Sequence, residues 1–271
     1  MTDATLGANW RGTRMTHREF IRDMLLMGKA LPELFNFPGW LLEYVMIDLM
    51  HTGDLGIIPV LLGNVAWELI CEWGGTATHC DDQVHTLMCM IRAAAKAIKL
   101  ERSPINRLTI NMIRLQGKSP KLKVNAGEAR RLLKVFNFIL EHFAANDTDH
   151  HRLRYNCVHA LYSMYELLED LKPENNDVVS KLGRQHVILY SEIARAHVPR
   201  DPTEKWLLWR MYPKHHLFLH CIEDQLTESG NPRDSWTYPD ERKIAEVVKM
   251  AESSNTLCLH TAIMRRYRLT L

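Results

Sequence analysis

The stretch Asn125-Ala-Gly-Glu-Ala-Arg-Arg-Leu-Leu-Lys-Val-Phe-Asn-Phe-Ile-Leu-Glu-His-Phe143 indicates most clearly how this chain folds. Its apolar residues recur at steps of three and four, which places them on one face of an α-helix. They are Ala126, Ala129, Leu132, Leu133, Phe136, Ile139, Leu140 and Phe143. A helix with one apolar face is stable when that face is buried against other elements. The stretch therefore predicts a helix that contributes to a hydrophobic core.

The same periodicity continues on both sides of this stretch. Apolar residues repeat from Leu153 to Leu171, where Pro173 ends the helix. We expect further helices at about Thr16–Leu26, Pro59–Leu69, Asp82–Lys99, Asn176–His197, Lys214–Thr227, Asp240–Ser253 and Thr256–Tyr267. The segment from Asp81 to His197 should then be an all-α subdomain. Its predicted core includes Leu132, Leu133, Phe136, Leu161, Met164 and Leu168.

One segment favours a β-strand instead. Leu41 to Leu49 is an almost continuous apolar run, which suits a strand covered on both faces. A buried strand needs partners for its N–H and C=O groups. Those partners lie either in the weakly patterned first 40 residues or in a part of the sheet that this chain lacks. The predicted fold class is therefore mainly α with a minor β component.

Composition limits the class of protein. The chain has 271 residues, 46% of them hydrophobic and 24% charged, as is ordinary for a soluble globular protein. A formal net charge of +2 does not by itself indicate a nucleic-acid-binding protein, so that case depends on local patches. No stretch approaches the about 20 consecutive apolar residues of a membrane span, so no membrane partner is expected. Six scattered cysteines without a CxxC pair indicate reduced thiols and an intracellular compartment.

Acidic residues at two places in the chain have either a structural or a catalytic role. Asp48, followed by His51, either caps the next helix or binds a metal at the end of a strand. Asp240 and Glu241 follow Pro239 at a predicted helix start. There they either stabilise the helix dipole, by about 0.3–1 kcal/mol each, or supply a further catalytic carboxylate. Spacing alone does not choose between these interpretations.

Basic residues gather in the middle of the chain. Between Arg114 and Lys134 there are seven basic residues and one acid, Glu128. Such a run is either a solvated face or a surface that follows a phosphate backbone. No recognition-helix or zinc-finger pattern is present, so we expect any DNA affinity to be electrostatic and independent of base sequence. The candidate DNA-binding residues are Lys118, Lys121, Lys123, Arg130 and Arg131, with Lys214 at a later helix start.

Four short motifs together resemble CACTA-type and Plavaka/Kyakuja-like transposases, which are ribonuclease-H-like enzymes of the DDE type. Each motif is short, but all four stand in the order that the family shows. The resemblance covers about Phe37 to Tyr267. The motifs are Val45-Met-Ile-Asp-Leu-Met-His51, Lys118-Ser-Pro-Lys-Leu-Lys123 with Ala126, Glu128 and Arg130, Trp209-Arg-Met-Tyr-Pro-Lys-His-His216, and Gly230-Asn-Pro232 with Trp236-Thr-Tyr-Pro-Asp-Glu241.

The resemblance implies a fold and a set of site residues. It implies a partial ribonuclease-H-like α/β core, interrupted by a large all-helical insertion. It also implies that Asp48 and Glu241 bind Mg²⁺ as catalytic acids, with His51 beside Asp48 and Asp240 as the weaker match to the final acid. Two such metal ions activate the nucleophile and stabilise the leaving oxygen in phosphoryl transfer. We expect Asp48 and Glu241 to meet in the fold.

The chain also departs from the family, whose first catalytic aspartate lies on an earlier strand. Neither Asp3 nor Asp23 lies in a convincing strand. We therefore expect a transposase-derived catalytic fragment, nuclear by resemblance, with an incomplete active site and weak or absent cleavage of DNA. The alternative is a non-enzymatic helical protein that binds nucleic acid or protein. The expected organisation is a short-helical segment 1–36, a core remnant 37–75, a helical insertion 76–200 and a C-terminal part 201–271.

Overall fold

The computed structural model describes residues 8–13, 15–75, 79–101, 103–115, 117–199, 205 and 207–252. Within these residues the chain forms helices and no β-strand. The α-helices are α1 (His17–Leu26), α2 (Ile58–Glu72), α3 (Asp81–Ala97), α4 (Ile110–Ile113), α5 (Ala126–His142), α6 (Asp149–Glu169), α7 (Asn176–Ala196), α8 (Pro213–His220), α9 (Leu226–Ser229) and α10 (Tyr238–Glu252). Short 3₁₀ turns lie at Asn9–Gly12, Glu33–Asn36, Leu42–Tyr44 and Pro173–Asn175, and π-helices at Met50–Ile57 and Cys221–Gln225.

The predicted ribonuclease-H-like α/β core is wrong. Leu41–Leu49 is not a strand: it holds the 3₁₀ turn Leu42–Tyr44 and an irregular segment that leads into a helix. Val45 is 61% exposed, so the apolar run is not covered on both faces. A short apolar run has the same composition in a buried strand and in a partly exposed connection. The fold is helical throughout the described residues.

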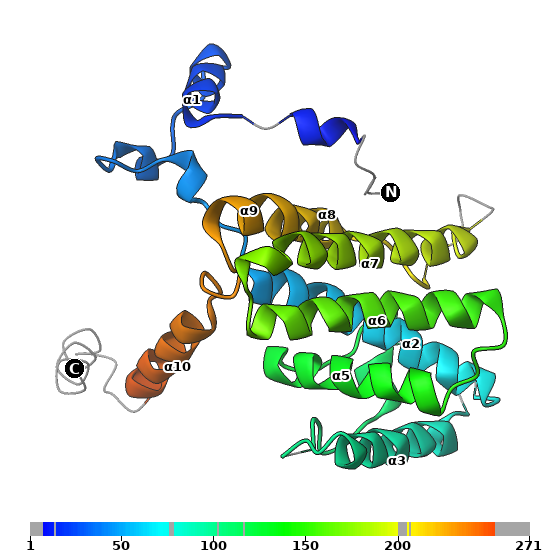
Figure 1. Ribbon diagram of the computed structural model, residues 1–271. Helices are drawn as coiled ribbons and strands as arrows, with labels where there is room; N and C mark the ends of the chain where they lie inside the picture. The colour runs from blue at the N-terminus through cyan, green and yellow to red at the C-terminus, as the bar shows by residue number, and fades with distance from the viewer. Residues whose placement is uncertain are drawn as a thin grey trace.

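A helical bundle forms the body of the protein. Helices α6 and α7 lie side by side, with α8 and α9 above α7, α5 below α6, α3 below α5, and α2 behind (Figure 1). The predicted core residues of α5 and α6 are all buried, which confirms that part of the sequence analysis: Leu132, Leu133, Phe136, Leu161, Met164 and Leu168. One hydrophobic cluster extends from Leu49 to Leu226, so it includes residues from each predicted segment after residue 36.

Local signals fix several helix ends. The Asn125 side chain accepts a hydrogen bond from the Glu128 N–H, and the Glu128 carboxylate accepts one from the Asn125 N–H. This reciprocal pair is a capping box, which satisfies two otherwise unpaired donors at the start of α5. Thr16 and Glu19 form the same pair at α1. The predicted helix at Thr256–Tyr267 lies outside the described residues.

The most apolar helical run is buried in the middle of the bundle. Met50–Glu72, formed by the π-helix Met50–Ile57 and α2, is long and apolar enough to cross a membrane by length and composition alone. The expectation that no stretch approaches a membrane span did not anticipate this run. Of its most apolar window, 83% is buried inside the protein. A core helix that other helices cover on all sides has this composition too.

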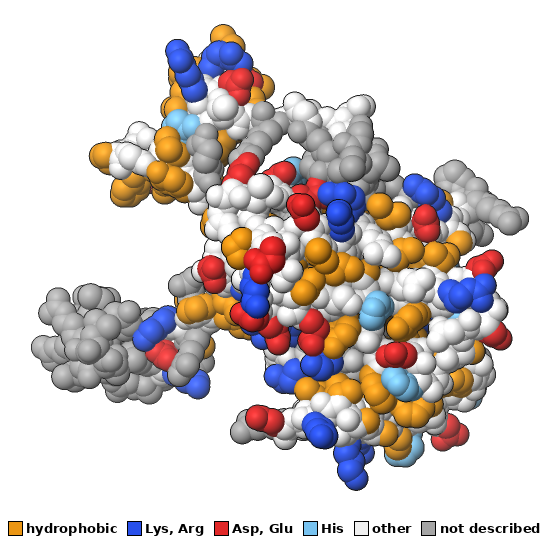
Figure 2. Space-filling model, in the orientation of Figure 1, with side chains coloured by type: hydrophobic (Ala, Val, Ile, Leu, Met, Phe, Trp, Pro, Cys, Tyr) orange, Lys and Arg blue, Asp and Glu red, His pale blue; other side chains and the backbone are white. Residues whose placement is uncertain are grey.

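The two ends of the described chain lie apart from the bundle. Near the N-terminus, α1 and the following turns pack around Phe35, whose ring contacts His17, Phe20 and Trp40. Hydrophobic side chains gather on the surface of this segment (Figure 2). At the other end, α10 extends away from the bundle (Figure 1). Its first turn contacts the bundle through Tyr238, whose hydroxyl donates to Asp54, and through Glu241, which lies beside His51.

Candidate nucleic-acid interface

An extended segment places three of the predicted basic residues on one side of the bundle. After α4 the chain crosses α2, where the Leu122 N–H donates to the Pro59 carbonyl at 2.8 Å. A Cβ atom at Gly63 of α2 would lie 2.7 Å from the backbone of Lys121, so only glycine allows this close crossing. The crossing fixes the backbone on either side of Leu122. The exposed cationic side chains that it carries are Lys118, Lys121 and Lys123.

A second wall, formed by the chain around Arg210 that leads into α8, faces Lys121. The position of this wall depends on Trp209, which is fully buried. Its backbone N–H donates to the Asn64 side chain at 2.8 Å, and its indole N–H donates to the Glu68 carboxylate at 2.5 Å. Its φ angle is 51°, in the region that non-glycine residues rarely adopt. These bonds from α2 hold the chain in that conformation just before Arg210 and α8.

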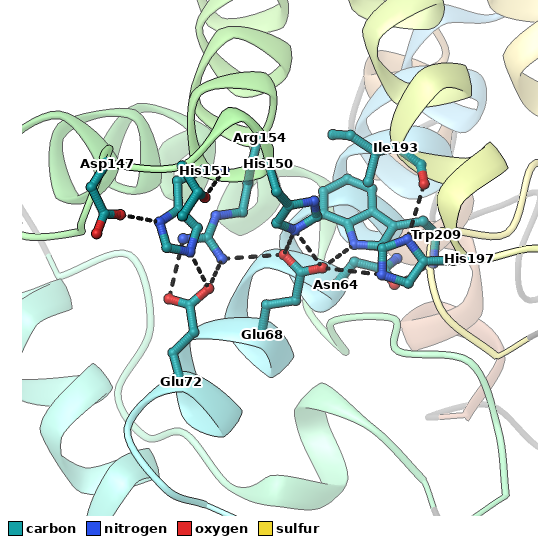
Figure 3. Close-up of polar contacts among 11 residues, drawn as sticks. Asn64, Glu68, Glu72, Asp147, His150, His151, Arg154, Ile193, His197 and Trp209 are labelled. Atoms are coloured by element: carbon teal, nitrogen blue, oxygen red, sulfur yellow. Dashed lines mark hydrogen bonds and ion pairs between the residues drawn. The ribbon is translucent and has the colours of Figure 1, made fainter.

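Glu68 belongs to a larger polar network (Figure 3). It also accepts hydrogen bonds from His150 at 3.1 Å and from the buried Arg154 at 3.2 Å, and Arg154 reaches Glu72 on the next turn. Burial alone raises the pKa of Glu68. The bonds from His150 and Trp209 and the charge of Arg154 outweigh burial and hold that pKa below its ordinary value. Glu68 therefore stays ionised and anchors Trp209.

Three adjoining cavities that share Lys121 together form a basic groove. The first lies between Pro59 of α2 and the lysine segment, and the other two lie between Lys121 and the chain from Lys205 to His215. They have volumes of about 310, 560 and 380 Å³, and all three are lined by Lys121. None of the described residues that line them is acidic. On the face of the bundle drawn in Figure 2, by contrast, basic and acidic side chains are interspersed. The cationic residues of the groove are Lys118, Lys121, Lys123, Lys205, Arg210 and Lys214.

Lys214 joins the groove to the residues that the resemblance singled out. Its ammonium donates to the carbonyl of His51 at 2.7 Å. Burial lowers the pKa of Lys214, and the positive charge of Lys121 lowers it further. The two lysines therefore repel each other across the groove. An anion bound between them would relieve that repulsion.

Asp48, His51 and Glu241 come together although Glu241 is far from the other two in sequence. One ring nitrogen of His51 contacts the Asp48 carboxylate, and the other lies 3.1 Å from the Glu241 carboxylate. The two acids therefore contact the same side chain, but the His51 ring separates their carboxylates, so they do not lie close enough to share one metal as expected. Asp240 stands beside Glu241 in the first turn of α10, and its side chain lies outside what the structure describes.

Asp48 has the environment of a helix cap. Its carboxylate accepts a hydrogen bond from the Met50 N–H at 3.0 Å, two residues into the helix that follows. It also accepts bonds from the hydroxyl of Thr237 at 2.5 Å and from the Thr237 N–H at 3.2 Å. Burial raises the pKa of Asp48, but the bonds from Thr237 and His51 outweigh it and lower that pKa overall. The structural interpretation of Asp48 therefore accounts for its contacts.

A third contact attaches α10, and it was not predicted from the sequence. Asp54 is fully buried in the π-helix and accepts a hydrogen bond from the Tyr238 hydroxyl at 2.7 Å. Burial raises the pKa of Asp54 to about 6. An acid six residues after Asp48 in an apolar segment was the available signal. A π-helical turn places successive side chains differently from an α-helix, so helical spacing did not reveal the contact.

The remaining basic candidates lie away from the groove. Arg130 points toward Asp54, with 4.0 Å between the paired atoms, and its guanidinium stacks over the rings of Trp236 and Tyr238. It holds the start of α10 in place. Arg131 lines a different cavity, together with Glu128 and Glu101. Closeness in sequence grouped these arginines with the lysines, and the turn of α5 separates them.

The carboxylates do not fit the Mg²⁺ ions that the resemblance implies. Such ions need oxygen atoms that converge on one point. Here the Asp48 oxygens are engaged by Met50, Thr237 and His51, and Glu241 lies on the far side of the His51 ring. Within the part of the chain that the structure describes, no group of three or more His, Cys, Asp and Glu side chains is arranged to hold a metal.

Replacing Asp48 by alanine should lower the free energy of unfolding by about 1–2 kcal/mol, because a helix cap and the anchor of Thr237 are both lost. Chemical denaturation measures this change. Glu192→Ala, at an exposed position in α7, is the matched control and should stay within about 0.5 kcal/mol of the unmodified protein. Equal stability of the two variants would show that Asp48 is not a cap.

No family model, curated protein or solved structure matches this chain.

Proposed function

We propose that this chain is a helical nucleic-acid-binding protein that holds the phosphate backbone of its partner in the basic groove. One observation carries the proposal: six cationic side chains from distant parts of the sequence line adjoining cavities whose described lining contains no acid. Lysines and arginines that neutralise phosphates release counterions from the nucleic acid, which drives binding. A strand laid in the groove would meet both walls.

The groove supports affinity without reading of sequence. Its cations are lysines and one arginine on loops and at a helix start, and no helix in the described residues presents a row of base-reading side chains next to it. Phosphate contacts position a nucleic acid and carry no sequence information directly. The expected dissociation constant at physiological salt is about 10⁻⁴–10⁻⁶ M, and it should rise steeply with salt concentration.

The test reverses charge inside and outside the groove. Lys121→Glu with Lys123→Glu should weaken binding to unrelated DNA sequences by a similar factor, about tenfold or more, and should flatten the salt dependence. Fluorescence anisotropy with labelled DNA at several salt concentrations measures both effects.

The matched control is Arg131→Glu with Lys96→Glu, which changes the net charge equally but lies outside the groove lining. It should keep most of the affinity. If both pairs weaken binding alike, net charge alone is responsible. If the unmodified protein binds no nucleic acid, the proposal is wrong.

The alternative is DNA cleavage by a transposase-derived fragment; its carboxylates do not converge on one metal in this structure, but one observation favours it. Asp48 and Glu241 both contact His51 at one end of the groove. Incubation with plasmid DNA and Mg²⁺ distinguishes the two functions. Cleavage that Asp48→Ala abolishes would support the enzyme. The binding protein should cleave neither with nor without this change, and its affinity for DNA should be the same in both.

A further inference from the structure

The third cavity of the basic groove differs from the other two in its walls. Its volume is about 380 Å³, within the range of small-ligand sites. Ile57 and Val60 come from the central helical run, and Tyr212, Pro213 and His215 from the start of α8. These walls are apolar or aromatic. Two ammonium groups are added to them, those of Lys121 and Lys214.

The walls are preformed. Ile57 and His215 are almost fully buried, and Val60 is 6% exposed. Burial lowers the pKa of His215 to about 3, so its ring is uncharged at neutral pH. That ring packs on Tyr190 with 4.5 Å between the ring centres, which fixes its plane. A flat, uncharged group could enter without displacing a charged side chain from the floor of the cavity.

Lys214 lies along the helix beside the cavity because of a glycine. A Cβ atom at Gly56 would come within 2.8 Å of the Lys214 side chain and 3.0 Å of the His51 carbonyl. Glycine therefore lets the aliphatic part of Lys214 rest against the helix, while its ammonium reaches His51. The aliphatic stem of Lys214 extends the apolar wall, and the Lys214 ammonium lies next to that wall.

An apolar slot beside a row of cations matches a ligand that has a flat ring next to an anion. A nucleotide unit has this chemistry. In a duplex the bases are paired and stacked, so a duplex can offer phosphates to Lys118, Lys121 and Arg210 but no base to the slot. An unpaired strand offers both, and proteins that bind single strands combine a cationic groove with pockets or rings for the bases.

We propose that the groove binds single-stranded nucleic acid, with one unpaired base in the cavity between Val60 and His215 and the adjacent phosphates on Lys121 and Lys214. This rests on the proposed function, because it specifies which nucleic acid the groove takes. The strand then runs from the cavity toward Lys118 and Arg210, along the second cavity of the groove.

The experiment uses the full chain and three labelled ligands of equal length: an oligothymidine strand, the same strand with abasic sites in place of thymidines, and a DNA duplex. We expect the oligothymidine to bind about tenfold more tightly than the abasic strand or the duplex, which is the effect of accommodating one base. Equal affinity for all three would overturn the inference and leave the proposed function standing. Binding of none would overturn both.

A variant tests whether the base binds in this cavity. Val60→Phe should fill the cavity and remove the preference for oligothymidine over the abasic strand. Val178→Phe, at an exposed position on α7, is the control and should keep the preference. A preference that survives in Val60→Phe would place the base elsewhere and overturn this assignment. If Val60→Phe does not fold, the three ligands on the unmodified protein still decide whether a base is bound.

A further arm separates a strand from a free nucleotide. Thymidine monophosphate, added at the same concentration of nucleotide, should compete poorly with the strand, because it contacts only Lys121 and Lys214. Competition as strong as that of unlabelled oligothymidine would identify a free nucleotide as the ligand and overturn the assignment to a strand.

Discussion

Trp209→Ala should lower the free energy of unfolding by about 3–5 kcal/mol, the usual effect of truncating a fully buried aromatic side chain. The change leaves a cavity and removes the indole N–H from the Glu68 carboxylate. Glu68 keeps His150 and Arg154 as partners, so the network is weakened and not abolished. Chemical denaturation measures the loss.

The more telling consequence concerns the groove. Trp209 holds the wall that carries Arg210 and Lys214, so its truncation should also weaken nucleic-acid binding by the molecules that remain folded. Phe136→Ala is the matched control, because Phe136 is equally buried but lies in α5, and its truncation should also cost about 3–5 kcal/mol. Its affinity should match that of the unmodified protein. Equal affinity of the two variants would show that Trp209 does not position the groove.

Acidification from about pH 6.5 to about pH 4 should destabilise the protein. His186 and His215 are fully buried, and burial lowers their pKa values from 6.5 to about 4 and about 3. The unfolded chain therefore takes up these protons at a higher pH than the folded chain, so stability falls as the pH decreases through this range. At about 1.4 kcal/mol for each unit of pKa shift, His186 alone contributes roughly 3 kcal/mol.

Other groups change the size of this effect. Burial raises the pKa of Asp54 to about 6. The hydrogen bond between His150 and Glu68 raises the pKa of His150. Both groups bind protons more tightly in the folded state and so oppose the loss in acid. Glu68, whose pKa is lowered overall against the effect of burial, adds to the loss as its carboxylate becomes protonated. The two buried histidines have the larger shifts, so we expect net destabilisation.

A substitution isolates the histidine effect. His186→Gln keeps a side chain that can hydrogen-bond but cannot take up a proton in this range, so its stability should fall less between pH 6.5 and pH 4. Urea denaturation at several pH values gives the comparison. His142→Gln, at an exposed position on α5, should keep the pH dependence of the unmodified protein. If all three proteins have the same pH dependence, the buried histidines do not control acid stability.

The amphipathic helices could be predicted from the sequence because their signals are local. The apolar face of Asn125–Phe143 became α5, and its start is set by two residues, Asn125 and Glu128, three positions apart. Leu161 and Leu168 are buried as their spacing predicts. The prediction of a strand at Leu41–Leu49 was wrong, because an apolar run of that length has no period that distinguishes a covered strand from an exposed connection.

The groove could not be predicted from the sequence and was found only in the tertiary structure. The lysines around Leu122 could be recognised as a basic run, but Lys205, Arg210 and Lys214 join them only through the fold. The fold also places Arg130 outside the basic groove, because its guanidinium points toward Asp54.

Helix formation depends on residues three and four positions apart, and the sequence by itself determined that this protein is built from amphipathic helices. Which charges share a surface depends on the crossing at Gly63, which has room for no side chain, and on the anchoring of Trp209 by Asn64 and Glu68. These contacts join residues far apart in the chain, and no local pattern encodes their distance. Tertiary packing therefore decided where the groove lies and which residues line it.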